Sequence, residues 1–170
     1  MIKSAHNGWY VLYVKYHHEK KVFDVLEQLA IKAFLPTIEI QSTRTDRKKM
    51  IQKLLFPSYV FVKINSSLDF YKTLSVNGAC MYIRFGMEYA KVSDEEIKKI
   101  QLLLLEKDLT EIETNVENFK VGDFKTISYG SLRGLECQVL NTNNINKIIV
   151  RIDSLQKNIT ATIPSYYLQN

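Results

Sequence analysis

The pattern of apolar and polar positions predicts that one strand, at residues 54–62 (Leu-Leu-Phe-Pro-Ser-Tyr-Val-Phe-Val), is apolar on both faces. Strand side chains alternate sides, which assigns Phe56, Val60, Val62 and Ile64 to one face and Leu55, Tyr59 and Phe61 to the other. Such a strand needs cover on both sides, but the neighbouring segments supply too few helices. One face is therefore expected to contact something other than the core of its own domain.

In the rest of the first 105 residues, the spacing of apolar residues changes between that of a strand and that of a helix. Residues 9–15 predict a central strand, and apolar residues at positions 22, 25, 26 and 29 predict an amphipathic helix to about residue 30. Further strands are predicted at 33–41, 80–85 and 89–92, and further helices at 67–76 and from residue 93 onward. The fold class is therefore α+β, with an antiparallel sheet that has helices on one side and is open on the other.

The second part of the chain has a different pattern. Residues 106–117 are acidic and polar without periodicity, and we interpret them as a linker between domains at 1–105 and 118–170. Short strands are predicted at 119–127, 135–140, 147–152 and 158–163, and their spacing fits a small closed β-barrel. Alternating valine, isoleucine and threonine favour strands over helices there, because these residues lose side-chain freedom in a helix.

The composition excludes several classes of protein. No apolar run in the 170 residues approaches the roughly 18 that a membrane span needs, and the start lacks the apolar core of a signal peptide, so a cytoplasmic protein is expected. Cys80 and Cys137 lack the paired spacing of a zinc or redox site, so buried free thiols are expected, with neither a metal nor a disulfide. Without a glycine-rich phosphate loop or a nucleophile elbow, the sequence indicates neither an enzyme nor a cofactor.

The net charge of +5 is distributed unevenly. Residues 1–64 carry 11 Lys and Arg against 5 Asp and Glu (+6), residues 65–117 carry 6 against 10 (−4), and residues 118–170 carry 6 against 3 (+3). Residues 42–53 lack periodicity and are rich in lysine and arginine, which predicts a basic hairpin tip. Basic surface in the first third of the chain indicates that nucleic acid lies nearby.

Several short sequences resemble the NusG family of transcription elongation factors. Phe-Pro-Ser-Tyr at 56–59 resembles a strand of the family's N-terminal domain, Trp-Tyr-Val-Leu-Tyr at 9–13 its opening strand, and Ile-Arg-Phe-Gly at 83–86 the end of its fourth strand. Val-Gly-Asp at 121–123, followed by Gly130 and Gly134, resembles the KOW motif of its C-terminal domain, although Cys137 stands where a third glycine is common. Residues 18–22 and 46–49 are more similar to the specialised RfaH and UpxY antiterminators.

The resemblance implies a fold and a function. It implies an N-terminal NGN domain that binds the clamp helices of the largest RNA polymerase subunit, contacts non-template DNA or upstream nucleic acid, and suppresses pausing or termination. It implies a C-terminal SH3-like β-barrel, the KOW domain, that recruits ribosomal protein S10 or Rho. A monomer associated with the nucleoid during transcription is expected. The alternatives are a housekeeping NusG-type factor and a KOW-containing RNA-binding or ribosome-associated protein.

The candidate site residues form three groups. The polymerase-binding group is Tyr13, Phe56, Tyr59 and Phe61, with ordinary core as the alternative. The nucleic-acid-binding group is Tyr16, His17, His18, Lys20, Lys21, Arg47, Lys48 and Lys49, with solvated surface as the alternative. By alignment with the family, Leu155 lies on the loop that meets the KOW partner, and a leucine that closes the barrel is the alternative.

Overall fold

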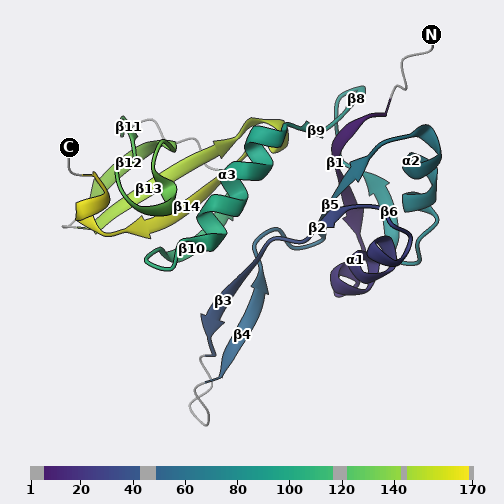
Figure 1. The fold of residues 1–170 in the computed structure, drawn as a ribbon, viewed down its shortest axis with the longest axis horizontal. Coiled ribbons are helices and arrows are strands. Elements are labelled where there is room, and N and C mark those ends of the chain that lie inside the picture. The colour runs from purple at the N-terminus through teal and green to yellow at the C-terminus, as the bar shows by residue number, and fades with distance from the viewer. Residues whose placement is uncertain (1–5, 43–48, 117–121, 143–144, 169–170) are drawn as a thin grey trace. The chain divides into compact units, whose positions relative to one another are not determined.

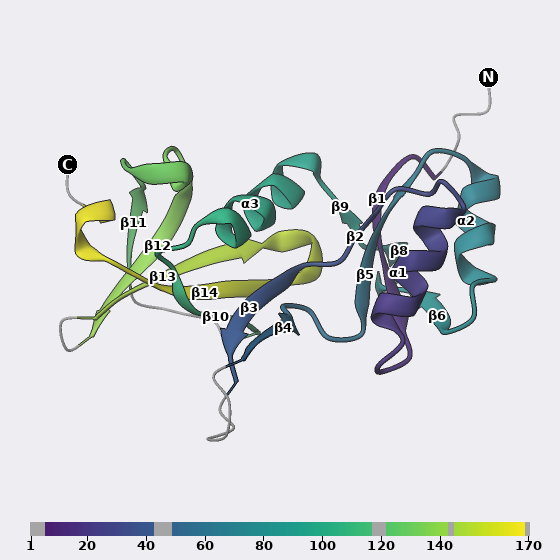
Figure 2. The same ribbon diagram turned by 60° about the horizontal axis from the view of Figure 1, so that its bottom comes forward.

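The computed structural model describes residues 6–42, 49–116, 122–142 and 145–168. The chain forms two compact units, and each is built from two separate stretches of sequence (Figures 1 and 2). The first unit contains residues 1–36 and 56–94, and the second contains residues 37–55 and 95–170. Among the described helices, none has the length and apolar character that a membrane span requires.

An antiparallel sheet forms the centre of the first unit, with strands in the order β2-β5-β1-β6 and with β9 also paired to β1. Its strands are β1 (Gly8–Val14), β2 (Ala33–Phe34), β5 (Tyr59–Ile64), β6 (Ala79–Tyr82) and β9 (Lys91–Val92). A hairpin of β7 (Arg84–Phe85) and β8 (Glu88–Tyr89) precedes β9. Because β1 lies between β5 and β6, the prediction that residues 9–15 form a central strand is confirmed.

Two helices, α1 (Glu19–Gln28) and α2 (Ser67–Leu74), pack on one face of this sheet. Their buried side chains share a core with alternate residues of β1 and β5, which are Tyr10, Leu12, Val14, Val60, Val62 and Ile64. The helix α2 begins where the Ser66 hydroxyl accepts a hydrogen bond from the Asp69 backbone N–H at 3.1 Å. The predicted combination of helices and antiparallel sheet is therefore confirmed.

The expected strand at 54–62 is interrupted. The strand β5 begins only at Tyr59, because the chain turns at 55–58 and Ser58 adopts a left-handed backbone with φ of 63°. The assignment of Phe56 to the same face as Val60 is wrong, since the Phe56 ring stacks on Tyr59 on the other face. The alternation rule fails here because it holds only for continuous extended backbone.

The second unit contains a hairpin, a helix and a five-stranded antiparallel sheet in the order β10-β14-β13-β12-β11. The sheet strands are β10 (Thr110–Asn115), β11 (Asp123–Thr126), β12 (Glu136–Thr142), β13 (Ile145–Ile152) and β14 (Lys157–Ile163). The hairpin is β3 (Thr37–Gln41) with β4 (Met50–Leu54), the helix is α3 (Asp94–Leu105), and the short 3₁₀ turns are η1 (Gly130–Leu132), η2 (Asp153–Leu155) and η3 (Ser165–Leu168).

Hydrogen bonds tie both ends of α3 to 3₁₀ turns of the second unit. Near its start, the Glu96 carboxylate accepts from the backbone N–H of Ser154 at 3.0 Å. Just after its end, Glu106 accepts from the Ser131 hydroxyl. The last turn of the chain is held at the same place, because the Tyr166 and Tyr167 hydroxyls donate to Asp108 at 2.8 and 3.1 Å.

The strands predicted in the C-terminal part are present, but the described residues show no closure of the sheet. Within the described residues, β10 and β11 lie at opposite edges and no pairing joins them. Residues 110–115 of the predicted linker form β10 and pair with β14, whereas their sequence indicated no regular structure. The domain boundaries at 105 and 118 stay a prediction, as does the closed barrel.

Candidate functional site

An aromatic row crosses the face of the first sheet that α1 and α2 leave uncovered. Tyr13 and Tyr59 lie directly opposite each other on β1 and β5, and so do Phe34 and Phe61 on β2 and β5. The row is continuous, with ring centroids 6.3 Å apart for Tyr13 and Tyr59, 6.5 Å for Tyr59 and Phe56, 5.5 Å for Phe56 and Phe61, and 5.9 Å for Phe61 and Phe34. The four residues predicted to bind polymerase are thus brought together.

The members of the aromatic row differ in their exposure. Phe56 and Phe61 are only 2% and 0% exposed, whereas Tyr13 is 40% exposed and Tyr59 is half-buried. Burial raises the pKa of the Tyr59 hydroxyl, and the neighbouring Tyr13 adds to this effect, so the hydroxyl stays neutral at physiological pH. The two tyrosines therefore offer amphipathic rings to solvent, with buried phenylalanines beside them.

A second candidate site is the turn between β1 and α1. The Tyr16 ring is 68% exposed and lies 3.9 Å from the His17 ring, centroid to centroid, and His17 has a left-handed backbone with φ of 65°. His18 is half-buried and packs closely on Gly78, where an added Cβ would lie 3.0 Å from the His18 Cβ. Tyr16 and His17 are therefore presented to solvent, while His18 helps to anchor the turn.

The predicted basic residues lie in two places. On α1, Lys20 forms an ion pair with Asp24 at 2.8 Å and lies over the Phe23 ring, and Lys21 is exposed. On the hairpin of the second unit, Lys49 is exposed, and its carbonyl accepts from the Ser42 N–H at 2.8 Å. The other two predicted residues, Arg47 and Lys48, lie outside the described residues.

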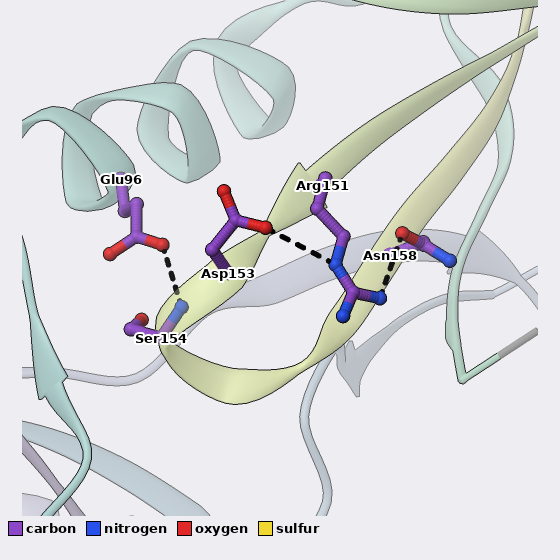
Figure 3. A network of polar contacts seen from close by, with 5 residues as sticks. All are labelled: Glu96, Arg151, Asp153, Ser154 and Asn158. Carbon is purple, nitrogen blue, oxygen red and sulfur yellow. Dashed lines mark hydrogen bonds and ion pairs between the residues drawn. The ribbon is translucent and has the colours of Figure 1, made fainter. Parts of the chain in front are cut away.

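Leu155 is the last residue of η2 and is only 3% exposed. The turn around it is held by polar contacts (Figure 3): Glu96 accepts from the Ser154 N–H, and Arg151 donates to Asp153 and Asn158, both at 3.4 Å. The burial of Leu155 favours the core interpretation over a direct contact with a partner.

Two residues of these sites were missed from the sequence. Phe34 extends the aromatic row, and Glu19 is a buried carboxyl that accepts a hydrogen bond from the Ser58 N–H at 2.9 Å. The signal for Glu19 was present, because it lies three and seven residues before the core residues Val22 and Leu26 on the same helix face. Within the described part of the chain, no group of three or more His, Cys, Asp or Glu side chains could hold a metal ion.

An aromatic row on a sheet face, near a turn with exposed rings and lysines, is typical of a protein that binds other macromolecules. A family model described as "NusG: Transcription termination factor nusG" matches residues 7–101, which is more than half of the chain. The chain therefore belongs to the NusG family of transcription factors.

Solved structures of other proteins are similar to this chain to different degrees. The NusG of Thermotoga maritima, described for its domain interaction, has 21% identity over 94% of each chain and a TM-score of 0.54, which supports a common fold. The MjSpt4:Spt5 complex in conformation B aligns over 95% of each chain with 14% identity and a TM-score of 0.35. In conformation A it aligns over 95% and 96% of the chains with 15% identity and a TM-score of 0.32.

Proposed function

We propose that this NusG-family protein is a specialised elongation factor of the antiterminator type, which binds RNA polymerase through its N-terminal domain and suppresses pausing or termination. The observation that carries the proposal is the aromatic row on the sheet face opposite α1 and α2. The proposed partner is the pair of clamp helices of the largest polymerase subunit. Helices that lie in an aromatic groove are a recurring mode of recognition, and a few buried aromatic residues then supply most of the affinity.

The exposure of the aromatic row supports a division of roles within it. Tyr13 and Tyr59 make the direct contacts, because both reach solvent and carry a hydroxyl for a hydrogen bond at the edge of the interface. Phe56 and Phe61 support them from within the protein. A ring that is already held in place loses little conformational entropy when it binds, so this arrangement favours affinity.

The turn between β1 and α1 is the proposed contact with nucleic acid. Tyr16 and His17 provide exposed rings on which unpaired bases can stack, and Lys20 and Lys21 follow directly on the first turn of α1. In the second unit, the hairpin with Lys49 is a separate proposed contact, because its positive charge favours phosphate groups. Single-stranded non-template DNA or upstream nucleic acid is the proposed ligand.

The C-terminal part, residues 118–170, is proposed to be an SH3-like KOW domain that binds ribosomal protein S10 or Rho, with residues 106–117 as the connection to the NGN domain at 1–105. The antiparallel strands β11, β12, β13 and β14 support this assignment, and β10 of the connection pairs with β14 in the same sheet. Because Leu155 is buried, it would meet a partner only after η2 has opened.

The polymerase contact is tested by replacing both Tyr13 and Tyr59 with alanine. The matched control is Tyr71→Ala, since Tyr71 is an exposed tyrosine on α2, across the sheet from the aromatic row. Loss of one interface anchor commonly costs about 2 kcal/mol or more, roughly thirtyfold in affinity. We expect the double variant to stay folded by circular dichroism and to lose binding to the RNA polymerase of the source organism. A folded double variant that binds as tightly as the Tyr71 control would refute the proposal.

A further inference from the structure

Glu19 is buried although it carries an ionisable side chain. It is 3% exposed, and it is the one carboxyl among the buried polar side chains of the described residues. Burial of such a group is unfavourable unless hydrogen bonds compensate for the lost water. Glu19 meets this condition at 2.9 Å from the backbone N–H of Ser58, a residue 39 positions away in the sequence.

Ser58 is the point at which the chain needs such a hydrogen bond. Its φ of 63° lies in the left-handed region, which residues other than glycine rarely adopt. Hydrogen bonds hold it on both sides, because its N–H donates to Glu19 and its carbonyl accepts from the Val14 N–H at 2.9 Å. The turn is closed by a further hydrogen bond from the Tyr59 N–H to the Phe56 carbonyl at 3.1 Å.

This turn determines where the aromatic row lies. Phe56 precedes it and Tyr59 follows it, and their rings stack with an interplanar angle of 4°. Both side chains therefore lie on the same face, whereas a continuous strand would place residues three positions apart on opposite faces. If Ser58 were extended, strand alternation would move Phe56 to the helix-covered face. The hydrogen bond to Glu19 thus helps to keep Phe56 beside Phe61 and Tyr59.

Glu19 also belongs to the structure of the nucleic-acid turn. It is the first residue of α1 and directly follows Tyr16, His17 and His18. A carboxyl in the first turn is favourable for a helix because it faces the positive end of the helix dipole. The same side chain therefore joins the start of α1 to the turn at 56–59.

We propose that Glu19 is a positioning residue: it fixes the left-handed turn at Ser58, and through this turn it holds the aromatic row in the geometry that binds RNA polymerase. This inference rests on the function proposed above. A role limited to the start of α1 is the alternative, and it predicts an effect on stability without a specific effect on Ser58 or on the aromatic row.

The test compares Glu19→Ala with Glu19→Gln and with Asp24→Ala. Glutamine keeps an oxygen that can accept from the Ser58 N–H, whereas alanine removes it. Asp24→Ala removes one negative charge from the same helix, and the ion pair of Asp24 lies within α1 itself. We expect Glu19→Ala to weaken polymerase binding roughly tenfold, and we expect Glu19→Gln and Asp24→Ala to stay within about twofold of the unchanged protein.

Nuclear magnetic resonance of Ser58 provides the readout that a general loss of stability would not change. In Glu19→Ala the Ser58 amide proton should lose the chemical shift of a hydrogen bond to a carboxyl, and its scalar coupling should show a change in φ. In Asp24→Ala both values should be unchanged. If Glu19→Ala binds polymerase as tightly as Asp24→Ala, or if its Ser58 signals do not move, the inference is overturned.

A second substitution keeps the inference testable if Glu19→Ala folds poorly. Glycine adopts a positive φ without steric cost, so Ser58→Gly in the Glu19→Ala background should restore the turn and most of the binding. Absence of this rescue would show that Glu19 acts elsewhere. If the unchanged protein does not bind polymerase at all, the proposed function fails, and the Ser58 signals still decide whether Glu19 fixes the turn.

Discussion

Gly130 and Gly134 permit a controlled measurement of packing in the second unit. Both have a left-handed backbone conformation, with φ of 67° and 85°, but their surroundings differ. A Cβ at Gly130 would lie 2.8 Å from Cε1 and 3.1 Å from the hydroxyl oxygen of Tyr167, whereas a Cβ at Gly134 would meet nothing within 4 Å. Alanine at Gly134 therefore introduces backbone strain alone, and alanine at Gly130 also displaces Tyr167.

The two costs can be estimated separately. A left-handed backbone costs an L-residue about 1–2 kcal/mol, and this applies to both variants. Displacement of Tyr167 also weakens its hydrogen bond to Asp108 at 3.1 Å. Hydrogen bonds to charged groups contribute about 1.5–3 kcal/mol. Because Asp108 is exposed to solvent, we reduce the expected contribution of this hydrogen bond to about 1–2 kcal/mol. The effect on the unfolded chain is the same for both substitutions and cancels in the comparison.

We therefore expect Gly130→Ala to lower the free energy of unfolding by about 2–4 kcal/mol and Gly134→Ala by about 1–2 kcal/mol. Native-state hydrogen exchange of amides in β13 and β14 measures this quantity for the second unit alone. Equal losses in the two variants would refute the reasoning, because they would show that Tyr167 can move aside at no cost.

Two further predictions concern single side chains. Hydrogen bonds from Lys63 and Trp9 lower the pKa of Asp94, so the stability that it contributes is present above its ordinary pKa of 3.8 and is lost as the pH falls through the lower value of the folded state. The emission of Trp9, the single tryptophan, should change in that acid range, and Asp94→Asn should abolish the change. Burial raises the pKa of the Cys137 thiol to about 11, whereas the expectation of a buried Cys80 is wrong, because Cys80 is exposed. At neutral pH a thiol reagent should label Cys80 alone by mass spectrometry, with Cys137 reacting only in denaturant; equal labelling of the folded protein would contradict this prediction.

The regular elements of the first unit were predictable because their apolar periods are continuous. The strand β1 is a short continuous run of apolar and aromatic residues that is buried almost throughout, and the helix α1 has a clear period of 3.6 residues. The break at Ser58 was not predictable in the same way. A left-handed residue is usually glycine or asparagine, and here the conformation is held by a hydrogen bond from the Ser58 N–H to a carboxyl distant in the sequence, which no local pattern encodes.

The strand β10 shows a second limit of local reasoning. Its sequence, Thr-Glu-Ile-Glu-Thr-Asn, has low strand propensity at its acidic positions and suggested a linker. Pairing to β14 nevertheless satisfies backbone groups that would otherwise form an exposed edge. Its acidic side chains also find partners in the sheet, since Glu111 accepts from Thr162 at 2.8 Å and Glu113 lies 3.7 Å from Lys147. Pairing with β14 in the folded sheet therefore determined the structure of residues 110–115 more strongly than their local composition did.

The surplus of apolar residues around 54–62 is explained by the different depths at which they lie. Val60, Val62 and Ile64 belong to the core under α1 and α2, while Phe56 and Phe61 are buried on the opposite face. That leaves the two tyrosines to reach solvent, and both are fixed by rings behind or beside them. Sequence alone identifies the aromatic group but cannot rank its members by their exposure to solvent. That exposure depends on the turn at Ser58 and on the register of β1 with β5. Rings that already pack against one another lose little conformational entropy when a partner binds, and this is the condition under which a small number of aromatic contacts gives strong binding.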